Sequence, residues 1–151
     1  MAEIGFYHLT TTPLERALPK LLEKAVGTGQ RIVVMAGSEE RVEALNALLW
    51  TYDPASFLPH GSARDGNAAA QPIWLTAKDE NPNTAAILVL ADGASSARIG
   101  DYARCLEMFD GNDGEAVEQA RARWKAYLAA GHTLTYWQQN DRGGWEKKGQ
   151  T

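Results

Sequence analysis

The chain has 151 residues, of which 44% are hydrophobic, 23% are charged and one is a cysteine; this composition describes one ordinary globular domain and excludes a disordered chain. Lys and Arg number 15 against 19 Asp and Glu, and the resulting net charge of −4 argues against a protein that lies directly on bare DNA or an anionic membrane. A single cysteine cannot form an internal disulfide, so we expect a reducing compartment and place the protein in the cytoplasm.

Strands and helices are predicted to alternate along the chain. Short apolar or β-branched runs indicate strands at residues 4–9, 31–36, 72–77, 86–90 and 133–138. Apolar residues at helical spacing indicate helices at residues 13–26, 38–50 and 115–130, and residues 102–109 suggest a short helix that runs into a strand. This alternation predicts a single layered α/β domain, residues 1–139, with a mostly parallel central sheet flanked by helices. Residues 140–151 are polar, and we expect them to form a mobile C-terminal tail.

The helix ends carry local signals. Thr12 is expected to cap the first helix, with Pro13 at its first position. Pro19 lies inside the helical pattern and is expected to kink the helix or restart it. Ser38 is expected to cap the second helix, and Gly131 to stop the third.

Motifs for nucleotide, metal or nucleophilic chemistry are missing from the sequence. The turn after the second strand has one glycine, Gly37, instead of a phosphate-binding series, and Glu39 and Glu40 would repel a phosphate. The three histidines and Cys105 show no close metal-ligand pair. We therefore expect no cofactor, no metal and no catalytic residue. A small-molecule or nucleotide-binding α/β enzyme that lacks the standard motifs stays open as an alternative.

Large apolar residues gather at the end of the second helix and in the loop after it. They either form a flap that closes the core or an exposed patch that binds a partner. The sequence favours the flap for Tyr52 and Leu58, and the patch for Trp50 and Phe57. Pro59 belongs to the same segment.

The last helix combines basic and aromatic residues. Arg121 and Lys125 are four residues apart and share a helix face, with Trp124 beside both. In the plainer interpretation Glu118 pairs with Arg121, the basic residues are solvated and Trp124 belongs to the core. The expected apolar stripe consists of Val117, Ala120, Trp124, Tyr127 and Leu128. In the functional interpretation the segment forms a basic pocket with an aromatic floor, suited to an acidic peptide that ends in a hydrophobic residue and a free carboxylate.

Several short motifs, in order and at matching distances, resemble the chi subunit of bacterial DNA polymerase III holoenzyme. They are FYHL at 6–9, GQRI at 29–32, ALLW at 47–50, SFLPHG at 56–61, RARWKAY at 121–127 and AG at 130–131. The resemblance covers the chain to about residue 138. It implies a Rossmann-like fold without a nucleotide site, and a non-catalytic adaptor of DNA replication.

The same resemblance implies two partners and two binding surfaces. One partner is the C-terminal tail of the single-stranded DNA-binding protein, bound by Arg121, Trp124 and Lys125, with Asp110 at a position that is apolar in the family. The other is the psi subunit, which links chi to the clamp loader and would bind Trp50, Phe57 and Pro59. Nucleic acid would be contacted only indirectly, and no membrane is involved. Asp110 is expected to weaken the attraction for an acidic tail. A competing hypothesis, direct binding of single strands through Trp124, Trp137 and Trp145, conflicts with the net charge of −4.

Overall fold

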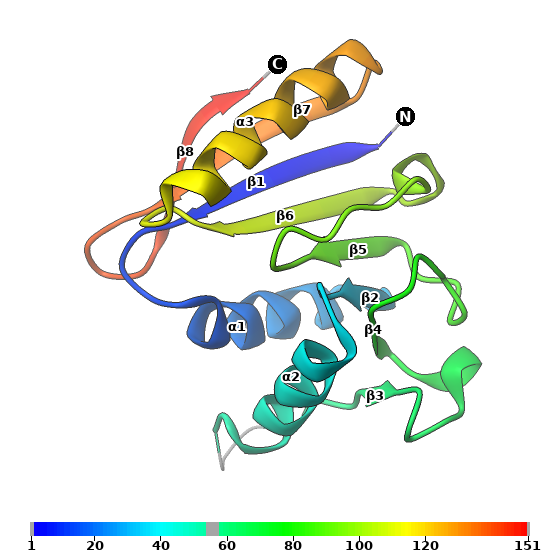
Figure 1. Ribbon diagram of the computed structural model, residues 1–151. Helices are drawn as coiled ribbons and strands as arrows, with labels where there is room; N and C mark the ends of the chain where they lie inside the picture. The colour runs from blue at the N-terminus through cyan, green and yellow to red at the C-terminus, as the bar shows by residue number, and fades with distance from the viewer. Residues whose placement is uncertain (1, 54–57, 151) are drawn as a thin grey trace.

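The computed structural model describes residues 2–53 and 58–150 and shows an eight-stranded sheet with helices on both faces (Figure 1). The strands are β1 (Glu3–Leu9), β2 (Ile32–Met35), β3 (Gly61–Ser62), β4 (Ile73–Thr76), β5 (Ile87–Leu90), β6 (Arg104–Asp110), β7 (Thr133–Gln139) and β8 (Trp145–Gln150). The helices are α1 (Leu14–Val26), α2 (Glu39–Thr51) and α3 (Gly114–Ala129), with 3-10 turns at Ala68–Ala70 and Ile99–Asp101. The predicted single α/β domain is confirmed.

The sheet has the strand order β3-β4-β2-β5-β6-β1-β7-β8. Every neighbouring pair is parallel except β7 and β8, which are antiparallel. All four residues of β2 and of β5 are buried, as expected for central strands that are covered on both faces. The continuous apolar runs in the sequence therefore predicted the centre of the sheet correctly.

Helices cover the two faces of the sheet unequally. Leu18 and Leu22 of α1, with Leu45 of α2, pack into one apolar layer against strand residues such as Val34 and Met108. The other layer lies under α3, which runs alongside β1 and β7 (Figure 1) and places Ala120, Val117 and Trp124 against Ile4, Phe6 and Leu134 of the strands. Alternate residues of β1 thus face opposite layers, which puts Phe6 and His8 on the α3 side.

Two of the three helices begin as capping rules require. The Ser38 hydroxyl accepts a hydrogen bond from the Arg41 N–H at 3.2 Å, which confirms its predicted role at α2. The Asp113 carboxylate accepts from the Glu115 N–H at 3.0 Å and so caps α3.

The start of α1 differs from the prediction. Pro13, not Thr12, occupies the cap position and no side chain caps the helix. The reason is that the Thr12 hydroxyl accepts a hydrogen bond from the Gln139 side chain at 2.7 Å, which ties the loop to the end of β7. The helix also continues through Pro19 without restarting; because proline has no N–H, the Glu15 carbonyl four residues earlier loses its helical donor.

Two further segments differ from the sequence prediction. The helical turn expected within residues 102–109 comes earlier, at Ile99–Asp101, and β6 follows from Arg104. The polar segment after β7 contains a strand that the sequence pattern missed, β8, whose Trp145 packs edge-on against Tyr7 at 5.1 Å. Lysines on this outer strand are typical of a sheet edge that must not pair further.

The chain changes direction between two neighbouring strands, β1 and β6. After β1 it crosses to the face that holds α1, and after β6 it crosses to the face that holds α3. The carboxyl ends of parallel strands at such a switch point form a crevice, which is the usual ligand site of open α/β sheets. The molecule has a crevice there and a second, smaller cavity beside it.

Candidate protein-binding site

The smaller cavity lies between α3 and the strands β1, β6 and β7, and has a volume of about 370 Å³. Its lining consists of Phe6, His8, Phe109, Val117, Ala120, Arg121, Trp124, Lys125 and Tyr136. Three of the four residues that the sequence analysis assigned to a tail-binding pocket, Arg121, Trp124 and Lys125, are therefore brought together.

Helical spacing explains how α3 lines this cavity. Trp124 is half-buried and packs with Val117 and Ala120 on the inner side, while Arg121 and Lys125 are exposed at the rim. Leu128, predicted to belong to the apolar stripe, is 46% exposed and lies outside it. Within residues 2–53 and 58–150, neither Arg121 nor Lys125 forms an ion pair, so Glu118 does not pair with Arg121 as the plainer interpretation required.

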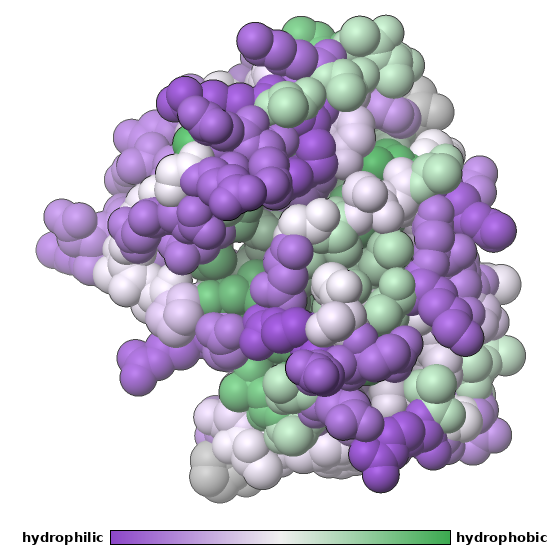
Figure 2. All heavy atoms as spheres, viewed as in Figure 1, coloured by the Kyte–Doolittle hydropathy of each residue, from purple (hydrophilic) through white to green (hydrophobic). Residues whose placement is uncertain are grey.

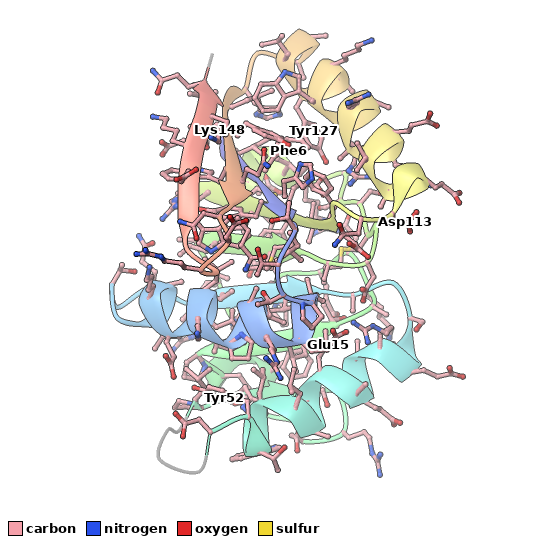
Figure 3. The ribbon with its side chains drawn as sticks, turned by 90° about the vertical axis from the view of Figure 1, so that its left-hand side faces the viewer. Phe6, Glu15, Tyr52, Asp113, Tyr127 and Lys148 are labelled. Carbon is pink, nitrogen blue, oxygen red and sulfur yellow. The ribbon has the colours of Figure 1, made fainter. Side chains whose placement is uncertain are left out.

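Aromatic rings form the floor of the cavity. The Trp124 ring meets Phe6 edge-on at 5.2 Å between ring centroids and Tyr136 at 6.3 Å. Figure 3 shows Phe6 on β1 close to Tyr127 on α3, and their ring centroids lie 5.9 Å apart. Edge-to-face packing of this kind fixes the rings, so the floor is preformed rather than assembled on binding.

A buried ion pair sets the rotation of α3. The Glu107 side chain on β6 is only 1% exposed, and its Oε2 accepts hydrogen bonds from Arg123 Nε and Tyr127 Oη, each at 2.8 Å. Burial raises the pKa of Glu107, whereas the charge of Arg123 lowers it and offsets part of that shift. Burial also raises the pKa of Tyr127, whose hydroxyl therefore stays a donor to the carboxylate. Arg123 is thus committed to Glu107, and Arg121 and Lys125 are left at the rim.

His8 lines the cavity wall at the end of β1. Its Nδ1 is hydrogen bonded to the Tyr136 hydroxyl, and its ring lies 5.0 Å from that of Phe109. Burial lowers the pKa of His8; a hydrogen bond with the backbone of Gly111 raises it, and the charge of Arg121 lowers it again. A Cβ at position 111 would overlap the His8 ring, so only glycine allows the turn to approach this closely.

Asp110, the fourth residue assigned to the pocket, lies next to the cavity and lines the larger crevice instead. Its Oδ1 accepts a hydrogen bond from the Asn112 N–H at 2.8 Å, so the carboxylate organises the turn before α3. Burial lowers the pKa of His8 on the cavity wall, and the charge of Asp110 nonetheless raises it by a smaller amount.

The larger crevice, about 570 Å³, lies at the switch point between β1 and β6. Five carboxylates line it, namely Glu15, Asp92, Asp110, Asp113 and Glu115. Glu15 and Asp113 stand at the starts of α1 and α3 (Figure 3), and hydrophilic residues cover the turn before α3 and its first half (Figure 2). Arg41 is held beside this crevice by Asp92 at 2.8 Å and Glu15 at 3.0 Å.

The aromatic segment after α2 forms a separate patch. Trp50 is 50% exposed, and its ring packs on His60 at 4.4 Å between centroids. His60 is itself buried and held by the carbonyls of Leu58 and Asn46. Leu58 is buried and Tyr52 packs against the core, as predicted for a flap, and Pro59 is half-buried. Phe57 lies outside the described residues.

The three tryptophans of the single-strand hypothesis do not form one surface. Trp124 packs into the apolar layer under α3, whereas Trp137 and Trp145 pack against the opposite layer. Tyr7 stacks with Trp137 at 6.2 Å, on that opposite side. The bases of one nucleic acid strand could not stack on all three tryptophan rings along a single face of the sheet.

The described part of the chain has no cluster of three or more metal-ligating side chains. None of its described helices combines the length and the apolar character of a membrane span. The fold and the cavities together define an open-sheet α/β domain whose preformed cavity is basic at its rim and aromatic at its floor.

Comparison with known proteins places this domain in a family. The family model of the DNA polymerase III chi subunit, HolC, matches residues 1–135. The chain therefore belongs to the DNA polymerase III chi subunit family, which confirms the resemblance found in the sequence and supports a role in DNA replication.

Individual relatives agree. A protein of Rickettsia prowazekii (strain Madrid E) named a probable DNA polymerase III subunit chi is 32% identical over 109 residues, which are 72% of this chain and 66% of that protein. The DNA polymerase III subunit chi of Escherichia coli (strain K12) is 23% identical over 107 residues, 71% of this chain and 73% of the relative. The C-terminal domain of the DEAD-box protein Dbp5 shares the fold, with a TM-score of 0.52 and 13% identity over 89% of this chain and 90% of that domain.

The sequence analysis missed four residues of the cavity, Phe6, His8, Phe109 and Tyr136. A signal was available for two of them, because alternation along β1 puts Phe6 and His8 on one face. Phe109 and Tyr136 reach the cavity because β6 and β7 flank β1 in the sheet. The local sequence around each residue does not reveal this strand order.

Proposed function

We propose that this chain is a non-catalytic adaptor of the replication machinery in the cytoplasm. It would bind the acidic C-terminal tail of single-stranded DNA-binding protein in the cavity under α3, and the psi subunit of the clamp loader at the patch around Trp50. The observation that carries the proposal is the meeting of Arg121, Lys125 and Trp124 at one preformed cavity. Membership of the chi family supports the same role.

The chemistry of the cavity suits the end of an acidic peptide. A volume of about 370 Å³ lies near the low end of the roughly 300–1,000 Å³ of ligand pockets, and it fits one or two residues rather than a large ligand. A terminal aromatic side chain would pack on Trp124 and Phe6. Arg121 can then form a forked hydrogen bond with the terminal carboxylate, and Lys125 one turn later can attract the preceding acidic residues.

The patch around Trp50 suits a different kind of contact. An exposed tryptophan packed at a tilt on a buried, hydrogen-bonded histidine is a rigid apolar anchor, the type of group on which protein interfaces concentrate their binding energy. The patch lies beyond α2, and the tail-binding cavity lies under α3. Because α2 and α3 pack on opposite faces of the sheet, the psi subunit and the tail could bind at the same time.

A binding measurement tests the tail-binding part of the proposal. Fluorescence anisotropy would follow a labelled peptide of four acidic residues and a C-terminal phenylalanine. Arg121→Ala and Lys125→Ala should each weaken binding roughly three- to tenfold, because a charge-assisted hydrogen bond contributes about 1.5–3 kcal/mol before solvent exposure reduces it. The same peptide with an amidated C-terminus should also bind more weakly.

Lys20→Ala is the matched control, since Lys20 is likewise an exposed lysine in the interior of a helix but lies on α1. It should leave the affinity unchanged. Equal affinities for wild type, Arg121→Ala and Lys125→Ala, with unchanged circular dichroism spectra, would contradict a tail site at this cavity.

A further inference from the structure

His8 and Tyr136 are the polar groups of the cavity wall for which the proposed tail-binding contacts give no role. Both line the cavity that holds Arg121 and Lys125, and the His8 Nδ1 is hydrogen bonded to the Tyr136 hydroxyl. Burial shifts the pKa of both groups most, and the positive charge of Arg121 lowers both. The pair therefore lines the same cavity in which Arg121 would hold a carboxylate.

The surroundings of His8 fix the direction of its hydrogen bonds. The backbone of Gly111 lies against the Nε2 edge of the ring, and the Gly111 N–H already donates to the Leu9 carbonyl at 2.7 Å. The other polar group of Gly111, its carbonyl, can only accept, so the tautomer that suits this neighbour carries its proton on Nε2. In neutral His8 the other nitrogen, Nδ1, then carries no proton and must accept the proton of the Tyr136 hydroxyl.

Protonation of His8 reverses this bond. When Nδ1 gains a proton from solvent it becomes a donor, and the Tyr136 oxygen must accept it. The hydroxyl proton of Tyr136 is then free to turn toward the cavity, where a ligand oxygen can accept it. No bond between heavy atoms forms or breaks, and one proton is taken from water.

We propose that His8 and Tyr136 form a proton-controlled anion-binding pair, which adds a hydrogen-bond donor and a positive charge to the cavity at mildly acidic pH and so strengthens the binding of a peptide carboxylate. The proposal rests on the proposed function, since it concerns the regulation of the same site.

The charges around His8 set the sign of the effect. Arg121 on α3 disfavours protonation of the empty site, whereas Asp110 at the end of β6 favours it. Lys125 lines the same cavity and adds positive charge, and Tyr136 on β7 is the remaining titratable neighbour. A bound carboxylate compensates the repulsion between protonated His8 and Arg121. By linkage, binding then draws a proton onto His8, and affinity rises as the pH falls.

The pH window follows from the free protein. Burial, the largest influence, holds the pKa of His8 below its ordinary value of 6.5, so the pair is in its neutral form at pH 7.5. Peptide carboxylates, with ordinary pKa values of about 4, stay ionised down to pH 5.5. A change in affinity between these two pH values therefore reports on the protein rather than on the peptide.

The test is calorimetric titration of the acidic peptide with a C-terminal phenylalanine into the full chain at pH 7.5 and pH 5.5. Wild type should bind roughly three- to tenfold more tightly at pH 5.5, the range expected for one added charge-assisted hydrogen bond at a partly exposed site. Near pH 6, titrations in two buffers of different ionisation enthalpy should show net proton uptake on binding.

Three variants locate the effect. His8→Leu and Tyr136→Phe should both lose most of the pH dependence, and Tyr136→Phe removes only one oxygen, so it keeps the test valid if His8→Leu folds poorly. His132→Asn is the matched histidine control: His132 accepts the Ala2 N–H at 3.0 Å, away from the cavity lining, and the Asn amide oxygen can take over that role. It should keep the wild-type pH dependence.

The outcomes separate the two proposals. Tail binding that does not change with pH, or that changes equally in His8→Leu and wild type, would overturn the switch while the adaptor role stands. Loss of the pH dependence in His8→Leu but not in Tyr136→Phe would show that charge acts without the hydroxyl, and would overturn the pair. Absence of peptide binding at both pH values would overturn both the proposed function and the inference.

Discussion

The two cavities on either side of Phe109 differ in charge as well as in volume. The larger crevice lies where open α/β sheets usually bind ligands, but carboxylates line it and the arginines near it are committed, Arg41 to Asp92 and Glu15 and Arg123 to Glu107. The smaller cavity lies to one side, yet Arg121 and Lys125 at its rim have no ion pair within the described ranges. Unpaired positive charge, and neither volume nor position in the fold, thus distinguishes the cavity at which we propose that an anion binds.

The largest effect is expected from the ion pair behind both cavities. Arg123→Ala leaves the Glu107 carboxylate buried without its charge partner, and should lower the free energy of unfolding by about 3–5 kcal/mol. Urea denaturation measures this. Arg64→Ala is the control, since the Arg64–Glu43 pair is exposed and should contribute less than about 1 kcal/mol. Equal losses in the two variants would mean that the buried pair does not hold α3.

A charge reversal should make the smaller cavity resemble the larger one. Arg121→Glu replaces a forked donor by a carboxylate, and should weaken binding of the acidic peptide by roughly tenfold or more at low salt. The difference from wild type should shrink in 1 M salt, where the Debye length is about 3 Å. Lys20→Glu on α1 changes the net charge equally and serves as the control. If both reversals weaken binding to the same extent, only the overall charge matters and the cavity does not.

A smaller effect is expected from the carboxylate between the two cavities. Asp110→Asn removes a negative charge near His8 and keeps an oxygen that can accept the Asn112 N–H. Peptide affinity should rise by about twofold, as for other exposed charges. Asp141→Asn, in the exposed turn before β8, is the control for net charge. An affinity that falls in Asp110→Asn would show that Asp110 contacts the tail favourably.

No detectable binding is expected when ATP or NAD is titrated into the protein. The switch-point crevice offers carboxylates rather than a glycine-rich turn, and Glu39 and Glu40 occupy the start of α2. A micromolar dissociation constant for either nucleotide, measured by calorimetry, would contradict the view that the larger crevice is not a nucleotide site. It would support the alternative of a nucleotide-binding enzyme.

The contacts of α3 were predictable from the sequence where they depend on helical spacing. Residues three and four apart share a helix face, so Arg121, Trp124 and Lys125 were placed together correctly. The same spacing could not show that Arg123 is committed to Glu107. A lone glutamate in the otherwise apolar segment of β6 was a signal for a buried partner, but its partner lies on another element.

Elsewhere the limits of the sequence come from long-range pairing. Thr12 has the residue type of a helix cap, but Gln139 at the end of β7 engages its hydroxyl instead. The strand β8 was missed because its only strongly apolar residue is Trp145, which packs on Tyr7 from the opposite end of the chain. His8 was identified as a strand residue, but its contacts with Tyr136 and Gly111 join residues more than 100 positions apart in the sequence.

The five tryptophans would report directly on where the tail binds, because Trp124 lines the cavity under α3 and the other four do not. Nuclear magnetic resonance of the side-chain indole N–H groups would follow all of them as the acidic peptide is added. The account predicts that the Trp124 resonance shifts in proportion to occupancy, while those of Trp50, Trp137 and Trp145 stay in place. A peptide that binds without moving the Trp124 resonance would contradict the assignment of the tail site to the cavity under α3.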